Sequence, residues 1–303
     1  MQKLVFVVAM IAALLSFSVG QAQVSVEARF APDQPVAVMA HRSADIGGMP
    51  ENSLAWIEAA IGLGVDMVHI NPQLTADGGY VLMHDHSLNR TTNVKDVFPN
   101  GPPNGPSRSQ RGGKDYVRDY TLAEIRQLRL VGGDGATDYA VPTLQEALEL
   151  VNGRVVVVLG LKGYEVESLA DALVGVEKRN ILLWQLYFSG TDQSKLRAAL
   201  EATGLDAAVV LYRSRNHLGD LEKIAAQLGP KLKLVSVSTP KLAPDFLNRL
   251  EELGARLMVS GFAGREDSAL VTKGDGTPWQ EALHVGFAAS TDHPALLLEL
   301  LGR

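Results

Sequence analysis

Apolar runs of strand length alternate with amphipathic helical stretches along most of this 303-residue chain. Continuous apolar runs are typical of strands buried on both faces of a parallel sheet, and the stretches between them have the length of helical crossovers. Eight runs fit this description: residues 36–41, 66–71, 155–161, 181–187, 207–212, 232–237, 256–260 and 287–291. Eight such units predict an α/β protein with a single (β/α)₈ TIM barrel over residues 36–303. The alternative is an open doubly wound sheet, but no G-x-G-x-x-G or P-loop follows any run.

Helix signals agree with this alternation. Apolar positions spaced three and four residues apart predict helices near residues 165–177, 191–202, 217–228, 243–253 and 278–284. Thr121 to Glu124 and Thr143 to Glu146 are capping boxes, and each opens a helix. Asn52 is a candidate N-cap for the helix that follows the first strand.

The second strand is followed by a hairpin and an irregular segment. Residues 76–79 predict its turn, so that paired residues sum to about 155, His84 lies beside Asn71, and His86 lies beside His69. Residues 93–118 are rich in Gly, Pro and Asn and carry several basic side chains. Long irregular segments in compact domains are usually functional or disordered, and we expect this insertion to overhang the site.

The ends and composition of the chain limit where it works. Residues 1–22 have the pattern of a signal peptide, with Lys3, an apolar stretch and small residues before a cleavage site after Ala22; the alternative is an uncleaved anchor. Residues 23–35 are then a tail before the barrel, and we expect export, most simply to a periplasm, without a stable membrane anchor. The chain has no cysteine, which excludes disulfides, thiolate metal sites and a lipidated N-terminal cysteine. Its net charge of −6, without a basic run, argues against nucleic acid as a partner.

Chemically capable side chains follow the apolar runs. In a (β/α)₈ barrel the active site lies where the carboxyl ends of the strands meet, so these residues share one mouth. Histidines exchange protons near neutral pH, and arginine and lysine bind phosphate. The sequence therefore predicts proton transfer on an anionic, phosphorylated small molecule. The candidates are His41, His69 and His84 for the imidazoles, and Arg42, Lys162 and Arg213 for the cations.

Several of these residues also fit structural roles. His69 projects from a buried strand and fits a hydrogen-bonded structural histidine nearly as well, and Arg213 fits a solvated basic loop. Asp85 either orients a histidine or caps a turn. Asp292 precedes His293-Pro294, and we expect it to cap the last helix. The remaining histidines are expected in loops: His86, His217, His284 and His293.

Taken together, these motifs resemble the glycerophosphodiester phosphodiesterase family. The resemblance rests on Ala40-His41-Arg42, residues 50–54 (PENSL), residues 74–78 (LTADG), His84-Asp85, residues 88–92 (LNRTT) and Thr291-Asp292-His293-Pro294. It implies a (β/α)₈ barrel that hydrolyses phosphodiesters to an alcohol and a phosphomonoester. It also implies that His41 and His84 are catalytic and that Arg42 contacts phosphate.

The positions of the expected divalent-cation ligands differ from the family pattern. The family places two carboxylates on the second strand and a third two residues before the lysine, whereas this chain has His69, Asn71 and Gly160. Hard cations such as Ca²⁺ and Mg²⁺ require oxygen ligands, and this set supplies few. Three hypotheses remain: a phosphodiesterase in which Arg42 and Lys162 replace the ion, a hydrolase with a His41–His69–His84 transition-metal site, or a catalytically silent barrel that binds a phosphorylated ligand.

Overall fold

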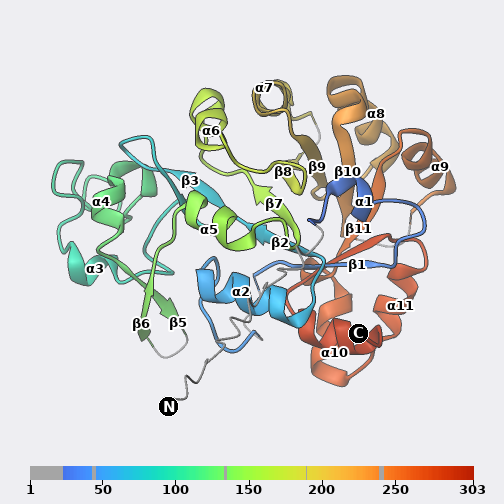
Figure 1. Cartoon of the computed structure of the whole chain (residues 1–303), viewed down its shortest axis with the longest axis horizontal. Helices are drawn as coiled ribbons and strands as arrows, with labels where there is room; N and C mark the ends of the chain where they lie inside the picture. The colour runs from blue at the N-terminus through green and yellow to red at the C-terminus, as the bar shows by residue number, and fades with distance from the viewer. Residues whose placement is uncertain (1–22, 43–45, 133–134, 189, 239–241) are drawn as a thin grey trace, which may run out of the picture.

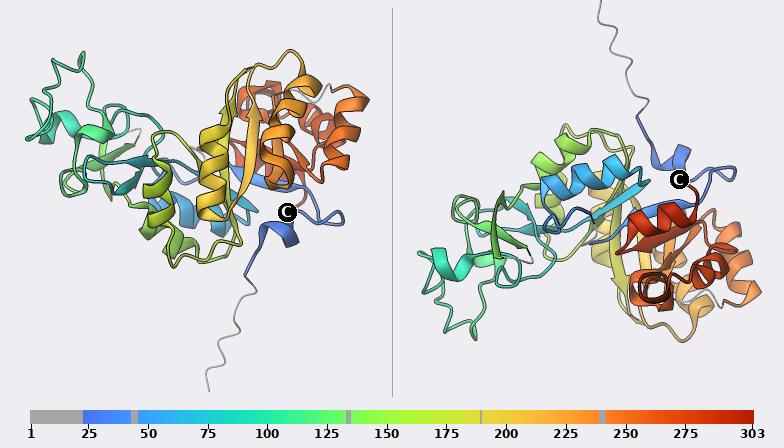
Figure 2. Two further views of the ribbon diagram at one scale, coloured as in Figure 1. Left: turned by 90° about the horizontal axis from the view of Figure 1, so that it is seen from above. Right: turned by 90° about the horizontal axis from the view of Figure 1, so that it is seen from below.

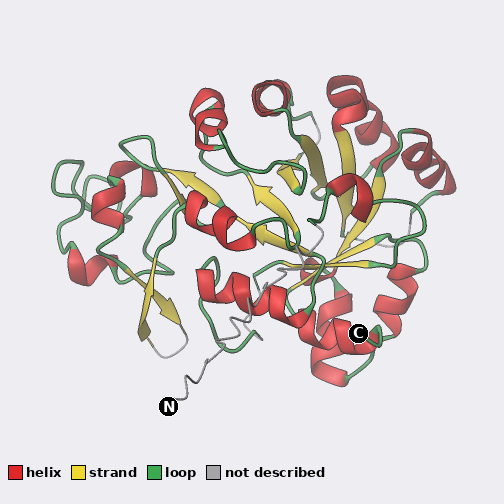
Figure 3. Ribbon diagram, viewed as in Figure 1, coloured by secondary structure: helices red, strands yellow, loops and turns green. Residues whose placement is uncertain are grey.

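The chain folds as a closed eight-stranded parallel barrel surrounded by helices (Figures 1 and 3). The computed structural model describes residues 23–42, 46–132, 135–188, 190–238 and 242–303. The predicted signal peptide therefore lies outside the described residues. No helix within these ranges is long and apolar enough to span a bilayer.

The barrel strands correspond one to one to the eight predicted runs, which confirms the (β/α)₈ fold. The strands follow the order β1-β12-β11-β10-β9-β8-β7-β2, and β2 pairs with β1 to close the barrel. Their bounds are β1 Ala37–Ala40, β2 Met67–Ile70, β7 Val156–Gly160, β8 Ile181–Tyr187, β9 Asp206–Leu211, β10 Leu232–Val237, β11 Arg256–Ser260 and β12 Ala288–Thr291.

Helices cover the outside of the barrel (Figure 3). Those that flank it are α2 Leu54–Leu63, α5 Leu144–Val151, α6 Val166–Ala172, α7 Ser194–Thr203, α8 His217–Leu228, α9 Pro244–Glu252, α10 Arg265–Lys273, α11 Thr277–Leu283 and α12 Pro294–Leu300. The sequence analysis missed α10, which is short and starts without a side-chain cap. Both predicted capping boxes are present, at α4 Leu122–Ile125 and at α5.

The interior of the barrel is packed, and its packing determines what lines the mouth. Met39, Met67 and Val158 belong to a buried cluster inside the barrel. Successive strand residues point to opposite faces, so the residue two positions further along each strand also points inward. This rule brings His41, His69 and Gly160 to the same level at the carboxyl end of the barrel.

The opposite end of the barrel is closed by the segment predicted to be a tail. Residues Val26–Arg29 form helix α1, and Val26 joins the interior cluster. The Arg29 guanidinium lies 3.0 Å from the Asp66 carboxylate at the start of β2, and Arg303 lies 2.8 Å from the same carboxylate. Both ends of the described chain are therefore tied to the end of the barrel that lies away from the mouth.

The prediction that Asn52 caps α2 was wrong. The cap is Ser53, whose hydroxyl accepts a hydrogen bond from the Trp56 amide. Asn52 instead has a positive φ of 60°, and its Oδ1 accepts a hydrogen bond from the Asn71 amide at 2.9 Å. The side chain thus holds the end of β2 rather than the start of the helix.

The hairpin is present, but its register differs by one residue from the prediction. Strand β3 (Pro72–Leu74) pairs with β4 (Tyr80–Leu82) so that Pro72 lies opposite Leu82. Beyond the ladder, the Met83 amide donates to the Asn71 carbonyl, so it is Met83 rather than His84 that lies opposite Asn71. His86 and His69 are not paired, because β2 is committed to its parallel barrel neighbours β1 and β7.

The insertion packs beside the barrel and does not overhang the site. Val94, Phe98 and Val117 share a separate apolar cluster with residues of the hairpin and of segment 120–141. This cluster includes helix α3 (Val94–Val97), a 3-10 helix (Val117–Asp119) and the unpredicted strands β5 (Arg129–Gly132) and β6 (Gly135–Ala140). Figures 1 and 2 show this region projecting from one side of the molecule. None of the described residues that line the mouth belongs to 93–118, because its apolar side chains have a core of their own to fill.

Candidate active site

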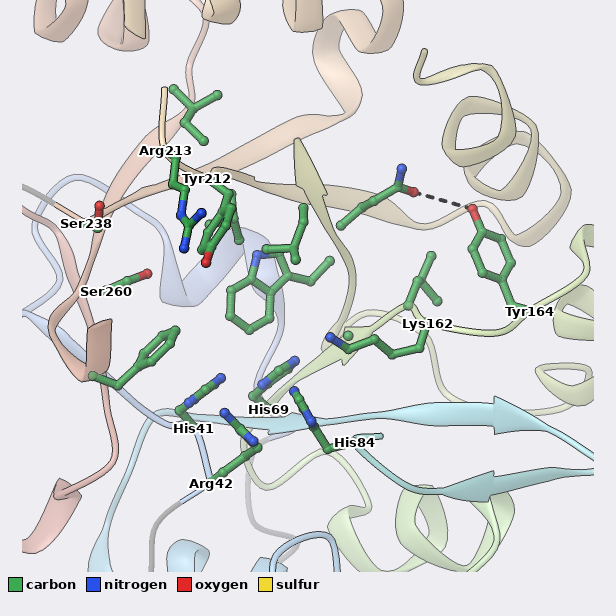
Figure 4. A pocket seen from close by; sticks show the side chains of 18 of the residues that line it. His41, Arg42, His69, His84, Lys162, Tyr164, Tyr212, Arg213, Ser238 and Ser260 are labelled. Carbon is green, nitrogen blue, oxygen red and sulfur yellow. Dashed lines mark hydrogen bonds between the residues drawn. The ribbon is translucent and has the colours of Figure 1, made fainter. Parts of the chain in front are cut away.

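A cavity of about 810 Å³ opens at the carboxyl end of the barrel (Figure 4). Most of the predicted site residues lie in its wall. Asn71 is the exception, since it is fully buried and does not line the cavity. The predicted residues in the wall are His41, Arg42, His69, His84, Gly160, Lys162 and Arg213.

His41 is oriented by a carboxylate from the last strand. Its Nδ1 lies 2.9 Å from Asp292 Oδ1, and the same oxygen accepts the Arg42 backbone amide at 3.1 Å. The prediction that Asp292 caps the last helix was wrong, because α12 begins after His293 and has no side-chain cap. A carboxylate at Nδ1 holds the proton there, so His41 Nε2 carries the lone pair that can accept a proton.

Asp292 is itself held in place by a buried carboxylate. Asp267 on α10 accepts hydrogen bonds from the Asp292 backbone amide at 2.8 Å, from Thr291 Oγ1 at 2.7 Å and from Trp279 Nε1 at 3.1 Å. Helix α10, which the sequence analysis missed, therefore positions the partner of His41.

His84 has a matching carboxylate of its own. Its Nδ1 lies 2.7 Å from Asp85 Oδ1, which favours the orienting role for Asp85 over the turn cap. Arg90 donates from Nε to Asp85 Oδ2 at 2.7 Å, and its Nη2 donates to Glu51 at 2.7 Å. The sequence analysis assigned no role to Arg90 or Glu51, although both lie within the family-like stretches.

Burial keeps the histidines of this mouth neutral in the free protein. It lowers the pKa of His41, and the Asp292 hydrogen bond offsets this only in part. Burial likewise lowers the pKa of His84 to about 4 despite its bond to Asp85, and burial together with neighbouring cationic groups holds the pKa of His69 well below its ordinary value. All three imidazoles thus start as potential proton acceptors at neutral pH.

This burial predicts how stability depends on pH. In the unfolded chain His41, His69 and His84 titrate near 6.5, so between there and their lower folded pKa values the unfolded state binds more protons. The free energy of unfolding should therefore be fully retained above pH 6.5 and decrease as the pH falls toward 4. Urea unfolding at several pH values measures the slope, which His69→Gln should reduce. The same replacement of exposed His284 is the control, and an unchanged slope in His69→Gln would contradict the assignment.

Two cationic side chains lie close together beside the histidines. Burial, followed by the neighbouring Arg42 guanidinium, lowers the pKa of Lys162. Arg42 lies 4.0 Å from Glu51 at its nearest nitrogen, and its buried Nε has no partner among the described residues. Two cations held together away from bulk water favour a bound anion.

Arg213 lines the same cavity from the other side. It lies across the opening from the group of histidines, Arg42 and Lys162 (Figure 4), next to the ring of Tyr212 at 5.1 Å. It is exposed and has a positive φ of 54°. Its position fits contact with a distal part of a ligand better than a shared phosphate clamp with Arg42 and Lys162.

The residues at the family's metal positions do not fit a hard cation. Asn71 Nδ2 lies 3.2 Å from His69 Nε2 and 3.2 Å from the Gly160 carbonyl oxygen. The only side-chain oxygen of the three is therefore that of an amide, whereas Ca²⁺ and Mg²⁺ sites rely on carboxylates.

The geometry also argues against the alternative site in which His41, His69 and His84 bind a transition metal. The His41 and His69 rings are stacked at 5.0 Å with only 4° between their planes, so their in-plane lone pairs run parallel and do not meet at one ion. Within the described ranges, no group of three or more His, Cys, Asp or Glu side chains is arranged to hold a metal ion.

Fold and site together define a (β/α)₈-barrel protein with two carboxylate-oriented histidines beside an anion-binding pair of cations. Comparison with known proteins agrees. The model of the glycerophosphoryl diester phosphodiesterase family matches residues 41–269, and the chain belongs to this family.

Individual relatives are more distant. A glycerophosphodiester phosphodiesterase from Caldanaerobacter subterraneus is 28% identical over 194 residues, which is 63% of each chain. The chain covers 53% of YhdW, a putative glycerophosphodiester phosphodiesterase of Bacillus subtilis, at 30% identity. It thus spans less than two thirds of the length of these relatives.

Solved structures share the fold. A glycerophosphoryl diester phosphodiesterase from Parabacteroides distasonis has a TM-score of 0.69 at 22% identity, with 92% of each chain covered. An Oleispira antarctica phosphodiesterase in complex with the product sn-glycerol-3-phosphate has a TM-score of 0.62 at 20% identity, covering 88% of this chain and 97% of that one.

Proposed function

We propose that the protein hydrolyses phosphodiesters of the glycerophosphodiester class to a phosphomonoester and an alcohol. The observation that carries this proposal is the pair of Asp–His contacts, Asp292–His41 and Asp85–His84, that face one cavity next to Arg42 and Lys162. Family membership and the names of the relatives agree with it.

The chemistry follows from these positions. Arg42 and Lys162 bind the anionic phosphate, and its negative charge raises the low proton affinity of the neighbouring histidines. One of His41 and His84 accepts the proton of a water molecule as its oxygen attacks phosphorus. The P–O bond to the leaving alcohol breaks, and the other histidine, protonated in the bound complex, donates its proton to the departing oxygen. Asp292 and Asp85 stabilise the imidazolium that forms at each position.

Hydrolysis in ¹⁸O-labelled water tests this proposal. The protein without residues 1–22 is incubated with sn-glycero-3-phosphocholine, and the products are followed by ³¹P NMR. We expect one phosphomonoester that carries ¹⁸O, because water attacks phosphorus. Saturable binding of the diester without turnover would instead support the catalytically silent barrel.

We also propose that the protein is exported after cleavage following Ala22, most simply to a periplasm. The support is the sequence of residues 1–22. N-terminal sequencing of the protein from a fractionated host tests this, and a chain that keeps Met1 in the cytosolic fraction would contradict it.

A further inference from the structure

His69, Asn71 and Gly160 fit one another as a set, although they stand where the family has metal ligands. A Cβ added to Gly160 would lie 2.1 Å from His69 Nε2 and 2.3 Å from Asn71 Nδ2. Separations this short are not tolerated, so an imidazole at position 69 requires glycine at position 160. The imidazole fills the space that a side chain at 160 would otherwise occupy.

Hydrogen bonding fixes the state of the His69 ring. The Gly160 carbonyl only accepts, so the Asn71 atom that faces it must be the amide nitrogen. The same nitrogen faces His69 Nε2 at 3.2 Å, and two donors do not face each other stably. His69 Nε2 therefore carries the lone pair, and Nδ1 carries the proton. The Nε2 lone pair, the usual metal-binding atom of a histidine, is already used.

The charges around this set disfavour a cation. Arg42 and Lys162 both depress the protonation of His69, which places positive charge on this side of the cavity. The nearest carboxylates have other partners: Asp292 contacts His41, and Asp85 contacts His84 and Arg90. An added divalent ion would meet repulsion without a compensating ligand.

The net charge offered to a phosphate does not fall when the ion is lost. In the family pattern three carboxylates outweigh the two charges of a divalent cation by one. Replacing all four with neutral His69, Asn71 and Gly160 leaves the attraction of Arg42 and Lys162 unopposed. An anionic phosphodiester then needs no metal to balance the site.

We propose that this site binds and cleaves its phosphodiester without a divalent cation, with the neutral His69 imidazole filling the ion's place and Arg42 and Lys162 holding the phosphate. The cleavage part of this inference rests on the proposed function, whereas the binding part does not.

Titration calorimetry on tag-free protein tests the binding part directly. We expect no saturable binding of Ca²⁺, Mg²⁺ or Zn²⁺ at millimolar concentrations. Glycerol 3-phosphate should bind with the same Kd in the presence and absence of EDTA, and Arg42→Ala or Lys162→Ala should weaken it about tenfold or more. Saturable metal binding, or loss of glycerol 3-phosphate binding in EDTA, would overturn the inference.

A designed reversal adds a second readout. The triple variant His69→Glu/Asn71→Asp/Gly160→Glu removes the ring and restores three carboxylates, so it should gain saturable Ca²⁺ binding. The matched control His69→Gln/Gly160→Gln has the same space without the charge and should bind none. Equal Ca²⁺ affinity in the unmodified protein and the triple variant would count against the proposed role of His69.

Hydrolysis assays separate the two proposals. Turnover that persists in EDTA supports both, and turnover that requires added Ca²⁺ or Mg²⁺ overturns the cation-free site. Absence of turnover under every condition, with EDTA-insensitive glycerol 3-phosphate binding, would refute the proposed function and leave the cation-free phosphate site standing.

Discussion

Replacing His41 or His84 with alanine is expected to lower kcat for phosphodiester hydrolysis by about 10²–10⁴-fold. Each imidazole lines the cavity and has its Nδ1 occupied by a carboxylate, so Nε2 is the atom left for proton transfer. Loss of both should be much less than additive, since each transfer depends on the other. Steady-state kinetics with sn-glycero-3-phosphocholine gives the measurement.

The two positions need different controls for folding. His41 is buried and stacks on Phe262 with ring centroids 3.7 Å apart, so its removal can disturb packing. His41→Asn and His41→Gln keep part of that volume, and unfolding midpoints report whether the fold survives. Exposed His284 on the far side of the barrel supplies a histidine replacement that should leave kcat unchanged. A His84→Ala protein with normal stability and normal kcat would remove His84 from the mechanism.

Asp292→Asn is expected to lower kcat by about 10²–10⁴-fold while the protein stays folded. The amide has the shape of the carboxylate, but it lacks the charge that stabilises a protonated His41, and it permits the wrong tautomer. Asp292 raises the pKa of His41 against the effect of burial, so its loss should move the acidic limb of the kcat/KM profile to lower pH.

This pH shift separates a positioning role from a merely structural one. Asp85→Asn should shift the limb that belongs to His84 in the same direction, because Asp85 likewise raises the pKa of that ring. Asp138→Asn, at an exposed carboxylate on β6, is the matched control and should change neither rate nor profile. An Asp292→Asn enzyme with reduced kcat and an unmoved acidic limb would point to altered packing rather than to His41.

Much of the fold could be predicted because its signals are local. Each barrel strand is a short apolar run, and both capping boxes lie within four residues. The failures are also local in origin. Helix α10 carries no capping side chain, and the register of the hairpin differs by a single residue, which turn residues alone do not determine.

The candidate site was predicted in its histidines and cations but not in their partners. Asp85 is adjacent to His84 in the chain, so its role was open to prediction. Asp292 is 251 residues from His41, and only closure of the barrel brings it there, through the pairing of Ala40 with Thr291. A closed barrel places its last strand beside its first, so the family-like Thr291-Asp292 motif held a usable signal.

The sequence by itself determined that this chain forms a parallel (β/α)₈ barrel, because periodic burial along each strand is written in consecutive residues. It also determined which residues reach the mouth, because strands of one barrel end together. Only the tertiary structure decided what those residues do to one another. That His69 needs Gly160, that Asn71 uses up the His69 lone pair, and that Asp292 serves His41 all depend on volumes and distances across different strands.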